Sequence, residues 1–167
     1  MDIISHGLYG GVLVGRRSRK SFWTSCFFGI APDLFSFGIF TASIWLQLAS
    51  GPDWSSDHPD VSQIPDYVNL LYGITHSLVI FALVFLIVWF IKKKPVWEML
   101  AWGFHVVLDI FTHNLHFFPT PFLWPISGYY FNGHSWGTLE VFIPNLTVLA
   151  ILYGWWWFQK RKKRATS

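Results

Sequence analysis

All twelve Lys and Arg residues of this 167-residue chain fall in three short clusters, and the long stretches between the clusters contain none. The clusters occupy residues 16–20, 92–94 and 160–164. Between them lie apolar segments, near 21–49, 69–91 and 138–159, each long enough to cross the hydrocarbon of a bilayer, which takes about 20 residues. So apolar a chain, 53% hydrophobic and 13% charged, is well past the usual balance of a soluble domain. The pattern therefore predicts a helical membrane protein.

The composition supports one membrane domain. Hydrophobic residues make up 53% of the chain and charged residues 13%, and 17 Phe, 11 Trp and 6 Tyr could form aromatic belts at both interfaces. We find no repeat or linker, so a single integral-membrane domain over 1–167 is expected. The lone Cys26 lies in an apolar run and is expected to pack there. Each basic cluster adjoins an apolar segment, which favours membrane topology and anionic lipid headgroups over nucleic acid.

The basic clusters also predict a topology. Two shorter segments, 2–15 and 96–114, are amphipathic, as expected of helices that pack on neighbours. Residues 1–20 lack the order of a signal peptide and are expected to be a retained first helix. If all three clusters lie in the cytoplasm, the chain crosses five times, with its N-terminus and the loops 51–66 and 117–137 outside and its C-terminus cytoplasmic. The predicted fold class is an all-α polytopic membrane bundle of about five transmembrane helices.

Five ionisable residues lie deep in these segments, on four different predicted helices: His6, Asp33, His76, His105 and Asp109. His6 lies 10 residues before Arg16, His76 lies 16 residues before Lys92, and the other offsets fall between these values. At about 1.5 Å per residue, all five lie in a layer about 9 Å thick in the outer half of the bilayer. Packing alone does not require coincident depth on four helices. The layer therefore predicts a functional site towards the outer face.

The expected partner of these buried groups is a metal ion. Asp33 and Asp109 cannot be neutralised by Lys or Arg, because none lies between the clusters. Imidazole and carboxylate are ligands of zinc, manganese and iron, and His105 and Asp109, at i and i+4, share a helix face. We predict one or two divalent ions, zinc before manganese or iron, bound by His6, Asp33, His76, His105 and Asp109. Taken singly, each residue has a plainer interpretation, such as a packing histidine or a helix-start acid after Pro32.

Three nearby residues are candidates for other roles. Glu140 and His113 lie one or two turns closer to the external loops. Glu140 is expected to be a general base or a further ligand, and His113 an orienting group or proton shuttle, with ordinary interface polarity the alternative for His113. Ser77 follows His76 and could act as a nucleophile. Packing between helices is the favoured role for Ser77, because no Ser/His/Asp spacing singles it out.

Five sequence elements occur in order along the chain. They are an early His6, "APDLFSFG" with Asp33, "GITHSLVI" with His76, "FHVVLDIFTH" leading into "PTPFLWP", and "GTLEVF" with Glu140. In type and order they resemble the membrane-bound metal-dependent hydrolases typified by LexA-regulated inner-membrane proteins. The resemblance covers most of the chain. It implies a location in the bacterial inner (cytoplasmic) membrane, and metal ligation at or beside the five buried residues.

Two elements depart from the pattern of that family. Residues 34–36, after Asp33, replace the usual hydrophobic-Asp-His, and Leu71 and Tyr72 stand where members usually carry His-Arg. Two candidate ligands and a cation are thereby missing, so one metal ion and two both stay open. The ligand types are also loosely similar to those of zinc-dependent phospholipase C enzymes.

A metal held in this layer indicates hydrolysis by a metal-activated water. Access from the outer leaflet, beneath aromatic and Pro-rich loops, favours a lipid or lipid-linked substrate. A phosphoester fits best, since metal would meet the phosphate charge where Lys and Arg are lacking. The sequence therefore predicts a phospholipase-like or lipid-phosphatase-like hydrolase.

Other functional classes account for the same residues less fully. A metal-ion or proton-coupled transporter is the main alternative, because His and Asp chains also relay ions across membranes. The inner half of the predicted bundle carries only Glu98, however, which favours an enclosed site. A membrane metalloprotease is disfavoured because H-E-x-x-H is absent, and a structural assembly factor would bind no metal. The sequence specifies neither the substrate nor the oligomeric state.

Overall fold

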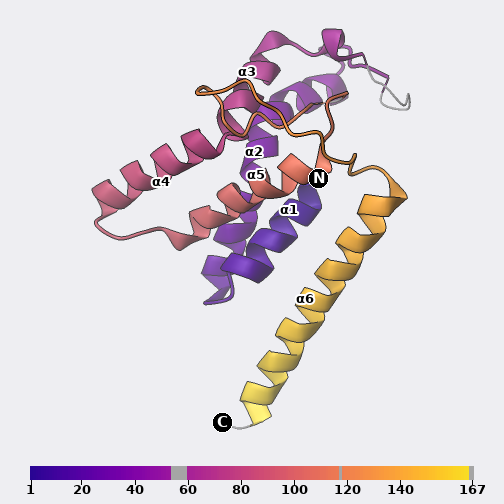
Figure 1. Cartoon of the computed structure of the whole chain (residues 1–167). Helices are drawn as coiled ribbons and strands as arrows, with labels where there is room; N and C mark the ends of the chain where they lie inside the picture. Colours follow the sequence, from indigo (N-terminus) through magenta and orange to yellow (C-terminus); the bar gives the residue numbers. More distant parts are fainter. Residues whose placement is uncertain (54–59, 117, 166–167) are drawn as a thin grey trace.

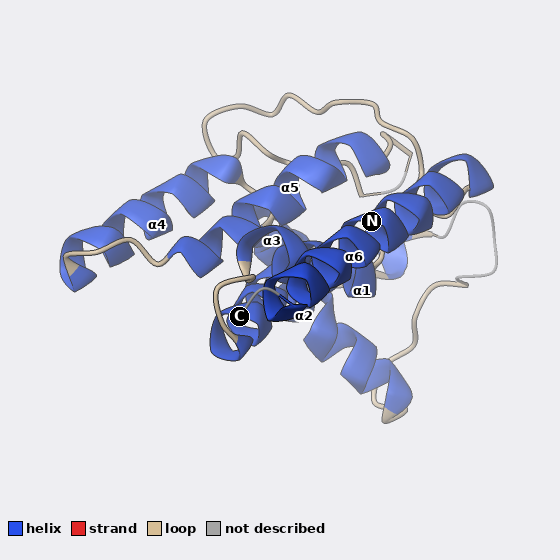
Figure 2. Ribbon diagram, turned by 90° about the horizontal axis from the view of Figure 1, so that it is seen from below, coloured by secondary structure: helices blue, strands red, loops and turns tan. Residues whose placement is uncertain are grey.

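The computed structural model describes residues 1–53, 60–116 and 118–165 (Figure 1). Within these ranges the chain forms six α-helices joined by loops and short helical turns, without a strand (Figure 2). The all-helical fold class is thus confirmed for the described part of the chain. The loop expected at 51–66 lies partly outside the described residues.

The helices follow the predicted apolar segments, with two interruptions. Their bounds are α1 (Ile3–Tyr9) with the π-helical turn η1 (Gly10–Val14), α2 (Arg19–Trp45), the turn η2 (Val61–Gln63), α3 (Asp66–Thr75), α4 (Leu78–Lys92), the turn η3 (Trp97–Met99), α5 (Leu100–Thr112) and α6 (Leu139–Ala165). The first predicted segment changes to π-helix at Gly10, and the segment expected at 69–91 divides into α3 and α4.

Two helical stretches are long and apolar enough to cross a membrane, Arg19–Trp45 and Leu139–Lys163. The helices α3 and α4 meet at 60° and form a third candidate span if the bent pair is counted as one. Large apolar side chains are exposed on these helices, including Trp23, Phe90 and Ile151, as a lipid environment would allow. These features suggest a membrane protein. The five-span topology and its orientation stay predictions.

Helix α2 lies at the centre and contacts α1, α3 and α5 (Figure 1). The approach of α1 to α2 depends on Gly29, where an added Cβ would lie 2.5 Å from the carbonyl oxygen of His6. Pro32, one turn further along α2, donates no backbone hydrogen bond and so loosens the ladder next to Asp33. The sequence of α2 therefore allows α1 and α5 to pack close to Asp33.

The break between α3 and α4 is stabilised by the loop that precedes α6. Ser77 caps α4, because its Oγ accepts from the backbone N–H groups of Val79 and Ile80. The same hydroxyl donates to the carbonyl of Trp124, and the N–H of Leu78 donates to the carbonyl of Phe122. Polar backbone groups freed by a helix break at membrane depth need such partners. The loop thus fixes the position of His76, which lies at the break.

The C-terminus of α4 and the start of α2 are stabilised in different ways. Helix α4 ends at Lys92. The next residue, Lys93, adopts the left-handed conformation (φ 54°), and Pro95 follows two residues after it. Near the start of α2, the Ser21 hydroxyl donates to Glu98 of η3 at 2.6 Å. This hydrogen bond holds the pKa of the Glu98 carboxyl below its ordinary value. It links α2 to the turn that begins α5.

Candidate metal centre

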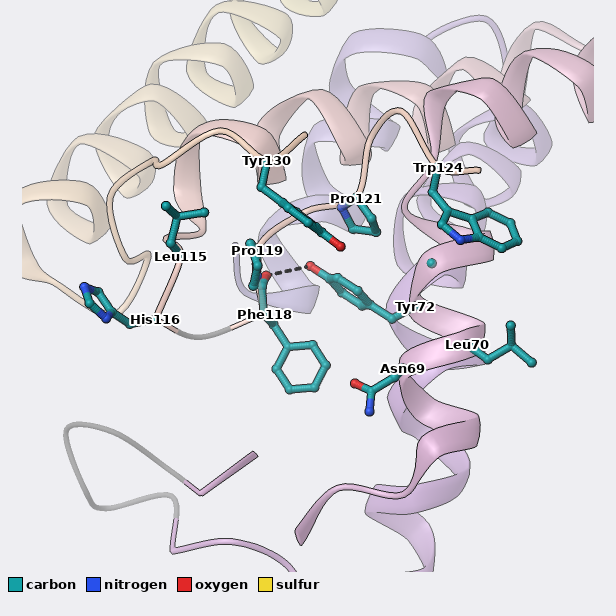
Figure 3. Close-up of a pocket in the computed structure, with 11 residues that line it drawn as sticks. Asn69, Leu70, Tyr72, Leu115, His116, Phe118, Pro119, Pro121, Trp124 and Tyr130 are labelled. Carbon is teal, nitrogen blue, oxygen red and sulfur yellow. Dashed lines mark hydrogen bonds between the residues drawn. The ribbon is translucent and has the colours of Figure 1, made fainter. Parts of the chain in front are cut away.

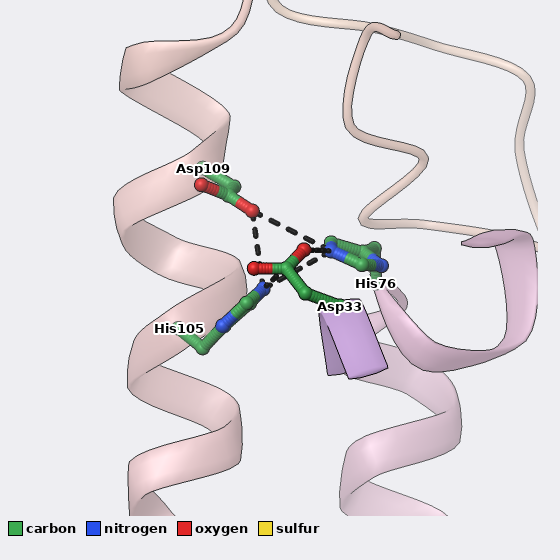
Figure 4. A group of neighbouring side chains, drawn as sticks. All are labelled: Asp33, His76, His105 and Asp109. Atoms are coloured by element: carbon green, nitrogen blue, oxygen red, sulfur yellow. Dashed lines mark hydrogen bonds and ion pairs between the residues drawn. The ribbon is translucent and has the colours of Figure 1, made fainter. Parts of the chain in front are cut away.

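Four of the predicted ligands meet in one buried group (Figure 4). Asp33 comes from α2, His76 from the α3–α4 break, and His105 and Asp109 from α5. One ligand atom of each lies within 4.8 Å of the others. Three of the side chains are buried, whereas the side chain of Asp33 is 18% exposed and forms the edge of the group. A buried group of two carboxylates and two imidazoles could hold a metal ion.

The hydrogen bond at the far side of each ring determines which nitrogen carries its proton. His105 Nδ1 lies 2.7 Å from the carbonyl oxygen of Gly29, and since a carbonyl only accepts, Nδ1 is the protonated atom. His76 Nδ1 lies 3.0 Å from Thr75 Oγ1, whose own proton goes to the carbonyl of Leu71. Thr75 therefore accepts from His76. When both rings are neutral, Nε2 of each carries a lone pair that faces the group.

Four electron-rich atoms consequently converge without a donor between them. The two Nε2 atoms of His76 and His105 lie 3.0 Å apart. Asp109 Oδ2 lies 3.1 Å from the Nε2 of His105 and 3.5 Å from that of His76, and Asp33 Oδ1 lies 3.3 Å from the Nε2 of His76. Asp109 Oδ2 is buried without a hydrogen-bond partner among the described residues. A positive charge at the centre would stabilise this arrangement.

The two oxygens of Asp109 face different neighbours. Oδ2 faces the four-residue group, whereas Oδ1 lies 2.9 Å from His6 Nε2 and also contacts the α-amino group of Met1. The ring of His6 stacks on that of His105, with centroids 3.6 Å apart. His6, predicted as a direct ligand, thus lies beside the group and orients both Asp109 and His105.

The backbone nitrogen of Met1 also lies beside the group. It contacts Asp109 Oδ1 and lies 3.1 Å from His113 Nε2, contacts that the count of Lys and Arg side chains did not include. With neutral imidazoles, the carboxylates of Asp33 and Asp109 bring negative charge into a buried place. A cation in the group would offset that charge.

His113 extends the site towards the loops. Its Nε2 lies 3.6 Å from Asp109 Oδ1, while its Nδ1 donates to the carbonyl of Phe118 at 2.8 Å. The hydroxyl of Tyr72 donates to the same carbonyl at 3.2 Å and lies 3.1 Å from His113 Nδ1. The Tyr72 ring stacks on His76, with centroids 3.8 Å apart. Tyr72 therefore contacts both histidines, a role that its sequence motif did not reveal.

A cavity of about 360 Å³ lies on the other side of Tyr72 (Figure 3). Aromatic and Pro residues dominate its lining, among them Tyr72, Phe118, Pro121, Trp124 and Tyr130. Among the described residues, neither an acidic residue nor Lys or Arg lines it. The volume is in the usual range for small-molecule sites, about 300–1,000 Å³. Tyr72 therefore both lines this cavity and stacks on His76.

The remaining sequence candidates lie apart from the group. Glu140 is exposed in the first turn of α6, and its role as a base or ligand stays a prediction. Ser77 uses its hydroxyl to cap α4 and to bind the carbonyl of Trp124, which fits the structural role that was favoured for it. The Thr75 and Gly29 contacts were not predicted. The contact with Thr75 could have been predicted, because a Thr directly before His76 can accept a hydrogen bond from its ring.

Comparison with models of known protein families, with curated protein sequences and with solved structures found no match to this chain. The family resemblance therefore rests on the five ordered sequence elements alone, which also contain His6 and Glu140. The arrangement of Asp33, His76, His105 and Asp109 provides a separate basis for a functional proposal.

Proposed function

We propose that this chain is a membrane-embedded, metal-dependent hydrolase that acts on a phosphoester of a lipid or lipid-linked substrate. The main support for this proposal is that the Nε2 atoms of two imidazoles and two carboxylates converge on one point. The Nδ1 proton of each ring is directed away from that point, to Gly29 from His105 and to Thr75 from His76. Metal-binding histidines in proteins commonly donate their second N–H to such an acceptor. Each ring therefore has the arrangement of a metal-binding histidine, with Nε2 facing the group and the Nδ1 proton held by an acceptor.

The residues also fit a particular class of ion. Two nitrogen and two oxygen donors suit zinc, with manganese or iron as alternatives. Asp33, His76, His105 and Asp109 would hold the ion, and His6 would orient Asp109. When bound, such an ion would supply a Lewis acid and a water of lowered pKa. The four described donors support one ion more directly than two.

A proton is the other charge that could neutralise the group. A proton on His76 could be shared with His105 or with one carboxylate, because the distances from its Nε2 are 3.0–3.5 Å. It would satisfy one or two contacts of the group at a time, whereas a divalent ion satisfies four donors together. The metal therefore accounts for more of the observed geometry.

The chain's own residues can handle protons and substrate. The Nε2 atom of His113 faces Asp109, so His113 is placed to take up a proton near the site and, through its contacts with Tyr72, lies towards the aromatic cavity. The uncharged cavity suits the hydroxylated or apolar part of a substrate next to its phosphate. We assign the phosphate to the metal group, since no Lys or Arg lines the cavity. Glu140 remains the proposed additional base.

We further propose five crossings, with the N-terminus outside and the C-terminus in the cytoplasm. The three basic clusters support this orientation through the positive-inside rule. In this topology, α2, the α3–α4 pair and α6 each form one span. Two shorter spans are formed by α1 together with η1 and by α5. The site then lies towards the outer face. The family resemblance supports the bacterial inner membrane.

A metal-ion or proton-coupled transporter is the second candidate, because helices broken at a binding site also occur in transporters. The break at His76 is such a feature. A transport path needs polar groups through the whole membrane, yet α4 carries only apolar residues from Leu78 to Ile91. This continuous apolar stretch favours the hydrolase.

Hydrolysis by detergent-purified, zinc-loaded protein tests the proposal. Labelled glycerophospholipids and polyprenyl phosphates are the substrates, and release of the phosphate or headgroup is measured. His105→Asn keeps a donor for Gly29 but removes Nε2, so it should reduce turnover at least about 100-fold. The matched control His134→Asn changes an exposed histidine and should keep full activity. Equal rates in both variants contradict the proposal, and zinc uptake into sealed vesicles without hydrolysis supports the transporter.

A further inference from the structure

A second cavity, of about 400 Å³, lies at the far end of α2 from the loops that cover the metal group. Residues from the connection before α2 and from the last turns of α6 line it, so segments distant in the sequence meet there. Four of the lining side chains are cationic, and two aromatic rings lie between them: Arg16, Arg17, Arg19, Lys160, Phe22 and Trp156. The lining contains no acidic residue.

Aromatic contacts hold these cations in place. The rings of Phe22 and Trp156 stack with centroids 5.5 Å apart, which joins α2 to α6 at the cavity. Lys160 Nζ lies 3.9 Å from the centroid of Trp156, and the guanidinium of Arg16 lies 5.1 Å from that of Trp155. Four like charges around one cavity repel each other, and the neighbouring Glu98 acts on Arg17 from outside the lining. An anion in the cavity would remove this repulsion.

The position of the cavity indicates the source of that anion. One candidate span begins at Arg19 and the other ends at Lys163, so the cavity lies where both helices reach the same bilayer surface. Lipid phosphates lie at this depth, and Trp residues prefer the same interface. Exposed apolar side chains, Trp23 and Phe27, continue from the cavity along α2, where acyl chains would lie.

We propose that this cavity binds the phosphate headgroup of an anionic phospholipid. Basic pockets between transmembrane helices are sites of this kind. The lipid would bridge the start of α2 and the end of α6, which also packs against α1 and η1. A lipid bound here would therefore stabilise the attachment of α6. The site is about 20 Å along α2 from Asp33, and it does not depend on the hydrolase proposal.

Lipid binding to the full chain in a neutral detergent tests the site, with dioleoyl phosphatidylglycerol as the probe and dioleoyl phosphatidylcholine as the uncharged comparison. Native mass spectrometry measures affinity. Arg16→Gln with Lys160→Gln removes two lining charges and should weaken phosphatidylglycerol binding about tenfold or more. Lys92→Gln with Lys94→Gln removes the same charge from the basic cluster after α4 and should leave binding within about twofold of wild type.

A photoactivatable phosphatidylglycerol provides a second measurement on the unaltered protein. Its label should appear in peptides that contain residues 16–22 or 155–160. Equal weakening in both double variants, or label spread equally over all three basic clusters, would show attraction by bulk charge and overturn the proposal. It would also be overturned if inorganic phosphate, without lipid, raised the unfolding temperature as much as phosphatidylglycerol does, since a soluble anion would then be the ligand.

Discussion

At the scale of single residues, the candidate site depends on where protons point. The ring of His105 is oriented by the Gly29 carbonyl and that of His76 by the Thr75 hydroxyl. Both contacts leave Nε2 as an acceptor beside Asp109. If the group binds a metal, Gly29 and Thr75 would orient its histidine ligands without touching the ion, and these neighbours should influence metal affinity.

Thr75→Val tests this orientation. Valine keeps the shape of the side chain but cannot accept from His76 Nδ1, so we expect metal affinity to fall about tenfold to 100-fold. Isothermal titration with zinc measures the change. Thr147→Val is the matched control, because Thr147 makes the same hydrogen bond to the carbonyl four residues earlier but lies exposed on α6. Unchanged affinity in Thr75→Val would show that His76 needs no such support.

At the scale of helices, the sequence predicted the apolar segments well and their interruptions poorly. Hydropathy placed one segment over 69–91, whereas the chain divides at His76 and Ser77. Besides the local cap by Ser77, the break is stabilised by the distant carbonyls of Phe122 and Trp124, which a local sequence pattern could not reveal. The i, i+4 pair of His105 and Asp109 was predictable, because helix geometry alone places both on one face.

Ser77→Ala tests the break. The substitution removes the cap of α4 and the bond to Trp124, and should cost about 1–2 kcal/mol of stability. Thermal unfolding in detergent measures the loss. Ser18→Ala removes the corresponding cap of α2, which has no bond to the loop before α6, and should cost less. If the two variants lose equal stability, the loop does not support the break.

The contact between α2 and η3 should depend on pH. The hydrogen bond from Ser21 lowers the pKa of Glu98 below its ordinary value of 4.5. The bond therefore contributes its full stability to the folded state above pH 4.5. This contribution is lost as the pH falls through the lower pKa that Glu98 has in the folded state. Ser21→Ala should therefore destabilise the protein at neutral pH, by less than about 1 kcal/mol because Glu98 is largely solvated, and have no effect in acid. Unfolding measured across this pH range checks the difference. Ser43→Ala, which removes a bond to a backbone carbonyl only, should give a loss independent of pH.

At the scale of the whole molecule, the two proposed sites lie at different levels of α2, one near its middle and one near its start. Asp33 and the loops near Trp124 belong to the metal group and its aromatic cavity, whereas Arg19 belongs to the basic cavity. Counting residues from the basic clusters predicted that the five buried residues lie at a similar membrane depth. A shared depth could not show which of their side chains are in contact. The α-amino group of Met1, which is not a side chain, escaped that reasoning altogether.

The most direct test of the account is the metal content of the purified protein, measured by elemental analysis after equilibrium dialysis against trace zinc. The account predicts about one equivalent in the unaltered chain and a near-complete loss in Asp109→Asn and His105→Asn. Asp60→Asn and His134→Asn, which change exposed residues, should keep the metal. Metal-free wild-type protein that is folded, with a protonated His76 in place of the ion, would contradict the central claim.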